Sequence, residues 1–189
     1  MTDTQWPRYI VFQQAKLGEP HQYAGSVHAP DAEMALLNAR DVFVRRPACV
    51  SLWIVPAGAI FAKTAEELAE NPTILDGIED QTKKPEHYYV FQKATQKGTY
   101  GYVGDVTAVS ADAAFTQVFE TVALRSAAGW WVFRADTVTQ SRPEDIEALF
   151  QPAMNKPFRD QAFYHTVAAM HTASRQVRTQ SQDTNIDEP

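Results

Sequence analysis

Five histidines and one cysteine carry most of the chemistry that this sequence could perform. They are His21, His28, His87, His165, His171 and Cys49. A carboxylate-bridged di-iron bundle needs Glu-x-x-His pairs, and no glutamate here has a histidine three residues later. One cysteine excludes multi-cysteine zinc and iron–sulfur sites, and neither GxGxxG nor GxxxxGK[ST] occurs. The residue types therefore indicate no catalytic or metal centre, and we expect Cys49 to be a small core residue.

A second group of residues points to binding rather than catalysis. Arg40, Asp41, Arg45 and Arg46 crowd the end of an expected helix. Basic residues there stabilise a helix by at most ~1 kcal/mol through its dipole, so taken alone they favour a solvated helix face. Arginine is also enriched among the residues that dominate protein interfaces, which makes a protein-binding surface the functional alternative. Trp6 lies outside the first expected strand, so its position is consistent with either a core residue or a residue that contacts a partner.

The composition bounds the classes of protein that this chain can belong to. Its 189 residues are 44% hydrophobic and 11% aromatic, enough for the core of one or two small domains. The net charge of -6 and pI of about 5.3 make nucleic-acid and anionic-membrane binding poor expectations. Apolar runs such as Cys49–Val55 are far shorter than the roughly 20 residues of a membrane span. Without a secretory pattern or a possible intrachain disulfide, we expect a cytoplasmic protein.

The chain contains two copies of one unit. The segment YIVFQQA at 9–15 aligns with YYVFQKA at 88–94. The same offset then pairs Tyr23 with Tyr102, Gly25 with Gly104, Ala35 with Ala114 and Arg46 with Arg125, and one deletion brings Trp53 onto Trp131. Two copies are fewer than the roughly three that a solenoid needs. The sequence therefore predicts a duplicated small domain.

Each copy is expected to fold as β-β-α-β. In the first copy, 9–15 and 21–29 read as strands, Asp31 caps a helix to about Arg46, and Val50–Val55 is the third strand. Because side chains alternate along a strand, five residues of the second expected strand are predicted to share one face: His21, Tyr23, Gly25, Val27 and Ala29. The expected buried stripe of the helix is Ala35, Ala39, Val42 and Phe43.

The second copy repeats this pattern. Ser110 is the expected helix cap, and Trp130–Phe133 is the third strand. The helix stripe is Ala114, Val118, Thr121 and Val122. His21 corresponds to Tyr100 on the apolar face, which indicates a half-buried structural histidine, whereas His28 lies on the polar face. Together the copies predict an α+β pseudo-dimer of two tandem β-β-α-β units, with a mostly antiparallel sheet and helices on one face.

We divide the chain into four segments on these patterns. They are a first unit at 1–62, a linker at 63–86 that begins with a short helix, a second unit with a C-terminal extension at 87–174, and a tail expected to be disordered at 175–189. A helical turn is expected from Pro143 to Phe150.

Four strings of the first copy occur in the same order, without gaps, in a known family. They are Trp6-Pro7-x-Tyr9-x-Val11-Phe12, Gly25-Ser26-Val27-His28-Ala29-x-Asp31, Met34-Ala35-Leu36-x-Asn38-Ala39-Arg40-Asp41 with Arg45-Arg46, and Ser51-x-Trp53-Ile54-Val55. This pattern resembles the PaaB family, the B subunit of the phenylacetyl-CoA epoxidase (ring 1,2-epoxidase) complex. The chain looks like two family units fused, the second of them diverged.

The resemblance implies a structural role in an oxygenase. In that family the di-iron catalytic subunit and a related structural subunit are separate chains, and a flavin and iron–sulfur reductase supplies electrons from NADPH. The family's own chain is non-catalytic, carries no cofactor and bridges catalytic–structural pairs. Its members are usually single units that dimerise, so the fused chain would be an intrachain pseudo-dimer in place of a homodimer.

We therefore expect a non-catalytic bridging subunit of a bacterial multicomponent oxygenase acting in phenylacetate degradation. The expected partner contacts are polar recognition by His28, Asn38, Arg40, Asp41, Arg45 and Arg46, with Trp6 and Trp53 as possible anchors. The second copy replaces parts of these strings, so the halves are not expected to bind partners equally.

Two alternatives remain. The first is a stand-alone α+β domain that binds a small molecule or an acyl-CoA between the halves, which a sizeable apolar cavity there would favour. The second is an enzyme, which would need His21 and His28 to converge with a carboxylate in one cleft.

Overall fold

The computed structural model describes residues 6–44, 49–70, 84–119 and 127–154, without the side chains of 152–154. Met1–Gln151 form one compact unit and Pro152–Pro189 another. Several expectations lie outside the described residues: Arg45 and Arg46, most of the linker, Thr121 and Val122 of the second helix stripe, and the tail. Within the described part of the chain, no helix has the length and hydropathy needed to cross a bilayer.

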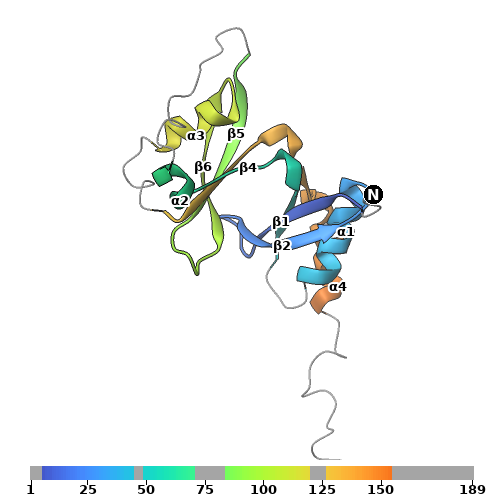
Figure 1. Ribbon diagram of the computed structural model, residues 1–189. Coiled ribbons are helices and arrows are strands. Elements are labelled where there is room, and N and C mark those ends of the chain that lie inside the picture. The colour runs from blue at the N-terminus through green and yellow to red at the C-terminus, as the bar shows by residue number, and fades with distance from the viewer. Residues whose placement is uncertain (1–5, 45–48, 71–83, 120–126, 155–189) are drawn as a thin grey trace, which may run out of the picture. The chain divides into compact units, whose positions relative to one another are not determined.

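The first repeat folds as β-β-α-β, as the sequence predicts. Its elements are β1 (Arg8–Gln14), β2 (Gln22–His28), α1 (Ala32–Phe43) and β3 (Ser51–Pro56), followed by the 3-10 turn η1 (Ala57–Ala59), β4 (Phe61–Thr64) and α2 (Ala65–Glu70). The predicted cap is confirmed, because the Asp31 carboxylate accepts a hydrogen bond from the Met34 backbone N–H at 2.8 Å. Figure 1 shows α1 beside β1 and β2.

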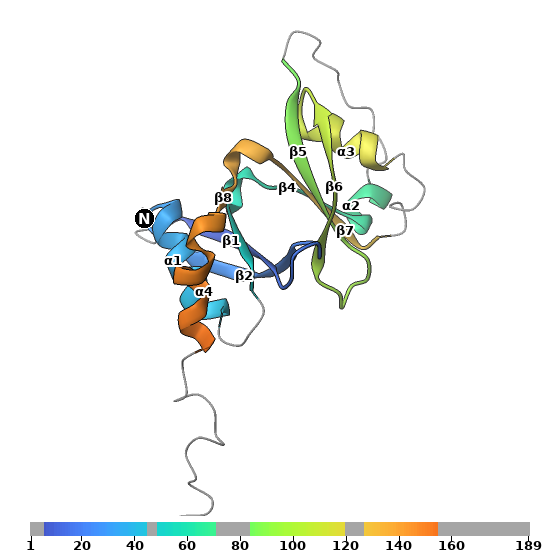
Figure 2. The ribbon, with the colours of Figure 1, turned by 180° about the vertical axis from the view of Figure 1, so that it is seen from behind.

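The second repeat has the same order of elements. They are β5 (Glu86–Lys93), β6 (Tyr100–Ala108), α3 (Ala111–Phe119) and β7 (Gly129–Arg134), followed by η4 (Ala135–Thr137), β8 (Thr139–Gln140), η5 (Pro143–Asp145) and α4 (Ile146–Met154). The Ser110 hydroxyl accepts from the Ala113 backbone N–H at 3.1 Å, which confirms the second cap. Figure 2 shows α4 next to α1.

The two repeats build a single sheet by exchanging their last strands. The order is β4-β7-β5-β6-β2-β1-β3-β8, and every pairing is antiparallel. β4 of the first repeat pairs with β7 of the second, and β8 of the second pairs with β3 of the first. The registers match across the pseudo-two-fold, because Ala62 lies opposite Trp131 as Gln140 lies opposite Trp53. Each repeat therefore completes the sheet of the other.

A β-bulge overturns the expectation that 21–29 alternates without interruption. Val11 pairs with Gly25 but Phe12 pairs with Tyr23, which leaves Ala24 as the extra residue. A bulge shifts the side-chain alternation by one. Tyr23 consequently packs in an aromatic cluster with Phe12, whereas Gly25, at φ +154°, faces Phe43 of α1. The second repeat keeps the same bulge at Gly104.

The helix stripe of the first copy is partly confirmed. Ala35 and Ala39 are fully buried, and Phe43 packs over Gly25. Val42 is 42% exposed, so its assignment to the buried stripe is wrong. The row of residues that faces the strands consists of positions 35, 39 and 43. Because one helical turn takes 3.6 residues, positions four apart shift gradually around the helix, and Val42 lies at the edge of this row.

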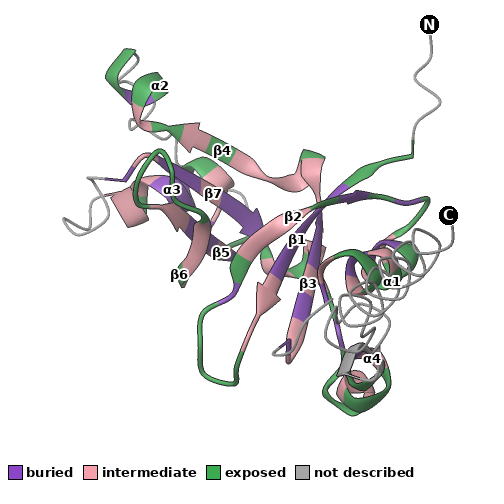
Figure 3. Cartoon of the chain, turned by 90° about the horizontal axis from the view of Figure 1, so that it is seen from below, coloured by how far each residue is buried: buried purple, intermediate pink, exposed green. Residues whose placement is uncertain are grey.

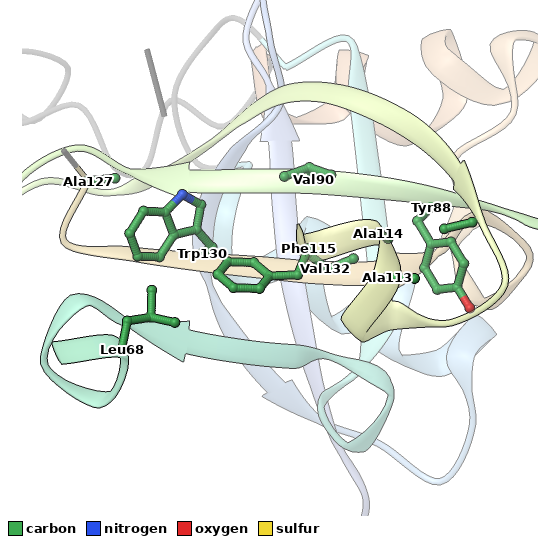
Figure 4. Packing of buried hydrophobic residues seen from close by; sticks show 10 residues of the cluster. Leu68, Tyr88, Val90, Ala113, Ala114, Phe115, Ala127, Trp130 and Val132 are labelled. Atoms are coloured by element: carbon green, nitrogen blue, oxygen red, sulfur yellow. The ribbon is translucent and has the colours of Figure 1, made fainter. Parts of the chain in front are cut away.

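Three layers of apolar side chains hold the fold together. One core lies beneath α3, where Phe115, Trp130 and Val132 pack with Leu68 of α2 (Figure 4). Leu68 lies in the segment that the sequence analysis assigns to the linker, so the short helix at the start of that segment contributes to the core of the second repeat. A central cluster joins Phe12 and other residues of the first repeat to the second: Ile10, Val55, Phe91 and Phe133. The third layer is the buried face of α1 against its strands, and buried positions recur along β1, β3, β5 and β7 (Figure 3).

We predict that Gly25→Ala destabilises the protein more than Gly104→Ala. Both glycines have a φ that side chains rarely adopt, at +154° and +158°, and each substitution should cost roughly 1–3 kcal/mol through backbone strain. A Cβ at 25 would also lie 2.5 Å from the Phe43 ring, whereas one at 104 meets none of the described residues within 4 Å. Urea unfolding of the two variants measures the difference. Equal losses would contradict a packing role for Phe43.

We also predict that the halves stay together when the linker is cut. A protease site is introduced within 71–83 and the chain is cut there without denaturant. The exchanged strands and the central cluster should then hold the fragments as one species in size-exclusion chromatography. The fragments should separate only in denaturant. Separation under native conditions would show that the exchange is too weak to couple the halves.

Candidate interaction surface

Three of the predicted contact residues are linked by hydrogen bonds. His28, at the end of β2, places Nδ1 2.9 Å from the backbone oxygen of Trp6. The side-chain amide of Asn38 on α1 donates to the backbone oxygen of His28 at 3.3 Å. The segment before β1, the end of β2 and α1 thus meet at one place, and Trp6 is 59% exposed there.

Arg40 and Asp41 lie further along α1 and pair with each other. The guanidinium donates from Nε and from a terminal nitrogen to one Asp41 oxygen, at 3.1 and 3.0 Å. Their side chains are 32% and 60% exposed. Such a solvent-facing pair contributes about 0–1 kcal/mol to stability. The fold therefore does not require the pair, which leaves both groups available for recognition.

Trp53 lies apart from these residues, inside the aromatic cluster. Its ring stacks between His21 at 3.9 Å and Tyr89 at 4.7 Å, measured between ring centroids. It occupies the inner face of β3, and most of its ring surface is already engaged. Its proposed part in partner binding stays a prediction.

The structure adds exposed apolar residues that sequence reasoning missed. Met34 and Leu37 are 43% and 40% exposed on the side of α1 opposite Ala35 and Ala39, and Val42 is 42% exposed at its edge. The signal in the sequence is that α1 carries apolar residues outside its buried row. We define the α1 surface as Trp6, His28, Met34, Leu37, Asn38, Arg40, Asp41 and Val42.

The second repeat lacks this surface among its described residues. The pseudo-two-fold counterpart of Met34 is Ala113, which is buried, and that of Leu37 is Thr116, whose hydroxyl donates to the Asp112 backbone oxygen. Of the large apolar residues that are exposed in the described ranges, Val103 alone belongs to the second repeat. The duplicated fold therefore presents two different helix faces.

The residues that could perform chemistry do not assemble into one cleft. His21 stacks on Trp53 and contacts the Ser51 hydroxyl at 3.1 Å, whereas His28 contacts Trp6. Burial raises the pKa of the Cys49 thiol to about 11, so it stays protonated in the core, as predicted. The described residues contain no group of three or more His, Cys, Asp or Glu side chains placed to hold a metal ion.

The space between the halves is filled with aromatic rings. The Phe12 and Phe91 ring centroids are 4.2 Å apart, and Phe133 lies 5.5 and 5.4 Å from them. These contacts occupy the place where a ligand-binding domain would need an apolar cavity. A groove of about 400 Å³ lies instead beside α3 in the second half, lined by Val90, Val103, Gly104, Asp105, Val106, Gln117 and Val118.

Comparison with known proteins gives one family. The family model "Phenylacetic acid degradation B" matches twice, over residues 5–89 and 84–171. The B subunit of the 1,2-phenylacetyl-CoA epoxidase of Escherichia coli (strain K12) is 46% identical over 70 residues, which cover 37% of this chain and 74% of that protein. No solved structure matches the chain.

We predict that His21 makes stability depend on pH. Burial lowers its pKa from 6.5 to about 4. As the pH falls from 6.5 towards 4, the unfolded chain takes up a proton at this position that the folded chain does not, so the free energy of unfolding should decrease. His21→Tyr should remove this component, because a tyrosine takes up no proton in this pH range. The tyrosine should also fit, since Tyr100 stacks on Trp131 at 3.7 Å between ring centroids at the equivalent position.

Urea unfolding at pH 7.0 and pH 4.5, in the native chain and in His21→Tyr, measures this difference. The native chain should lose more stability over the interval than the variant does. An equal loss in both would show that other groups account for the whole pH dependence.

Proposed function

The chain belongs to the phenylacetic acid degradation B family, and on that premise we propose that it is a non-catalytic bridging subunit of a multicomponent di-iron oxygenase that epoxidises phenylacetyl-CoA. The E. coli relative is named as the B subunit of a phenylacetyl-CoA epoxidase. Two family-model matches in one chain, with their described residues up to Gln151 in one compact unit, support a protein that does the work of two family units. The observation that carries the bridging role is the exposed α1 surface.

The composition of the α1 surface suits a protein partner. Trp6, Met34 and Leu37 offer apolar area that folding leaves in water, and full burial of such a side chain contributes about 1.5–3 kcal/mol. Asn38 and Asp41 provide polar groups beside them. An apolar centre with a polar rim is the usual arrangement of a protein interface. The partner surface should therefore be apolar, with polar groups placed to contact Asn38 and the Arg40–Asp41 pair.

The proposal assigns the redox chemistry to the partner chains. The di-iron centre belongs in the catalytic subunit, and the flavin and iron–sulfur groups belong in the reductase. This chain binds the catalytic and structural subunits and fixes how they are placed. Holding two assemblies through one covalent chain also removes the association step that two separate single-unit chains would need.

Co-expression of the chain with the catalytic and structural subunits of its source organism tests the proposal. Affinity capture and native mass spectrometry should give a defined complex, and its epoxidation of phenylacetyl-CoA should depend on this chain. The absence of a complex, with this protein remaining alone and folded, would overturn the bridging role.

A matched pair of variants tests the α1 surface. We predict that Leu37→Lys weakens capture of the partners at least ~10-fold, because a charge would be buried in an apolar contact. The control is Thr116→Lys, at the pseudo-two-fold equivalent position, with an acidic residue one turn earlier in both helices. The control should leave capture near that of the native chain. Equal effects, or an effect of the control alone, would contradict this docking face.

A further inference from the structure

The second repeat carries a cluster of titratable and aromatic side chains that the proposed function does not use. His87 and Tyr89 lie on β5, and Tyr102 and Asp105 lie on β6. The Tyr102 hydroxyl donates to one Asp105 oxygen at 2.9 Å, and His87 Nε2 lies 3.4 Å from the other. The Tyr89 ring stands nearly perpendicular to both the His87 and Tyr102 rings, with centroids 5.4 and 5.9 Å away.

This cluster is open to solvent, and its two tyrosine rings pack against Trp53. The His87 and Asp105 side chains are 45% and 49% exposed, and Tyr89 and Tyr102 are half-buried. The Trp53 ring stacks under Tyr89 at 4.7 Å and touches Tyr102 edge-on at 6.1 Å. The two tyrosine rings are therefore fixed in place beside an exposed carboxylate.

The first repeat shows that the fold does not need the cluster. At the pseudo-two-fold equivalent positions it has Arg8 for His87, Ile10 for Tyr89 and Ser26 for Asp105, while Tyr23 corresponds to Tyr102. The strands and the bulge are the same in both halves. A carboxylate and an additional ring have thus been placed on a scaffold that is stable without them, which favours a binding role over a structural one.

We propose that His87, Tyr89, Tyr102 and Asp105 form a recognition site for a guanidinium group, carried by an arginine side chain of a partner protein. A carboxylate attracts the cation and accepts its N–H groups, and a tyrosine ring face adds a cation–π attraction. No Lys or Arg of the described residues forms an ion pair with Asp105, so the negative charge is not neutralised by a permanent cation.

The chemistry of Asp105 excludes an anionic ligand. Its carboxylate accepts from the Tyr102 hydroxyl and, with burial as the larger cause, raises the pKa of that group to about 12. An anion would meet the same repulsion that disfavours tyrosinate. A carboxylate has about four lone-pair sites, so the two contacts within the chain leave room for the N–H groups of a guanidinium.

Nuclear magnetic resonance of the full-length protein tests the site. N-acetyl-arginine amide is titrated at constant ionic strength while the ring signals of Tyr89, Tyr102 and His87 are followed. Saturable shifts confined to these rings are expected. N-acetyl-citrulline amide, the neutral isostere, should shift them little. Equal responses to both compounds, or none to either, would overturn the proposal.

Two variants that take their residues from the first repeat test the site without unfolding the protein. Asp105→Ser and Tyr89→Ile introduce the residues that the first repeat has at the equivalent positions, so both variants should fold. Asp105→Ser should weaken binding at least ~10-fold, and Tyr89→Ile several-fold through the lost cation–π contact. Asp112→Asn, an exposed aspartate on α3, is the control and should bind as the native chain does. Unchanged affinity in Asp105→Ser would refute the assignment.

Discussion

The exchange of strands between the repeats is the constraint on which the rest of the structure depends. Without β4 and α2, the second half would expose the edge of β7 and the part of its core that Leu68 fills. Without β8, the first half would leave β3 without its outer neighbour. Unpaired strand edges and open cores are unfavourable in water. Each repeat is therefore a partial domain, and the aromatic cluster forms where the two partial domains meet.

This arrangement divides the residues of the chain into two sets. Residues that the copies share lie mostly in the strands and cores, as Phe12 with Phe91 and Val11 with Val90 do. Residues that differ include exposed ones such as Leu37, and also buried pairs such as Leu52 with Trp130 and Val55 with Phe133. Because even one added or lost methylene has a cost in a packed interior, the neighbours of these buried residues must differ in a compensating way. The internal two-fold thus serves as a comparison within one molecule, which separates what the fold needs from what it merely allows.

Much of the fold could be predicted from local signals in the sequence. Asp31 and Ser110 are helix caps that indicate where the two helices begin, and the β-branched and aromatic runs indicate the strands. The bulge at Gly25 could not be predicted, because its evidence is the pairing of Phe12 with Tyr23 across the hairpin. β4 and β8 have four and two residues, too few for a periodic pattern. Their pairing with distant strands is a tertiary property that no local window contains.

The candidate surface was predictable only in part, for a related reason. Motif matching finds residues such as Asn38 and Asp41 but does not reveal which side of α1 is covered. Met34 and Leu37 read as apolar residues that could equally be core, and only the position of the strands leaves them in solvent. Once the covalent link ensures that the halves meet, the second half no longer has to match the surface of the first. Duplication can then keep the strand order and the bulge alike while the α1 surface and the Asp105 cluster differ between the halves, and this difference is what both proposals rest on.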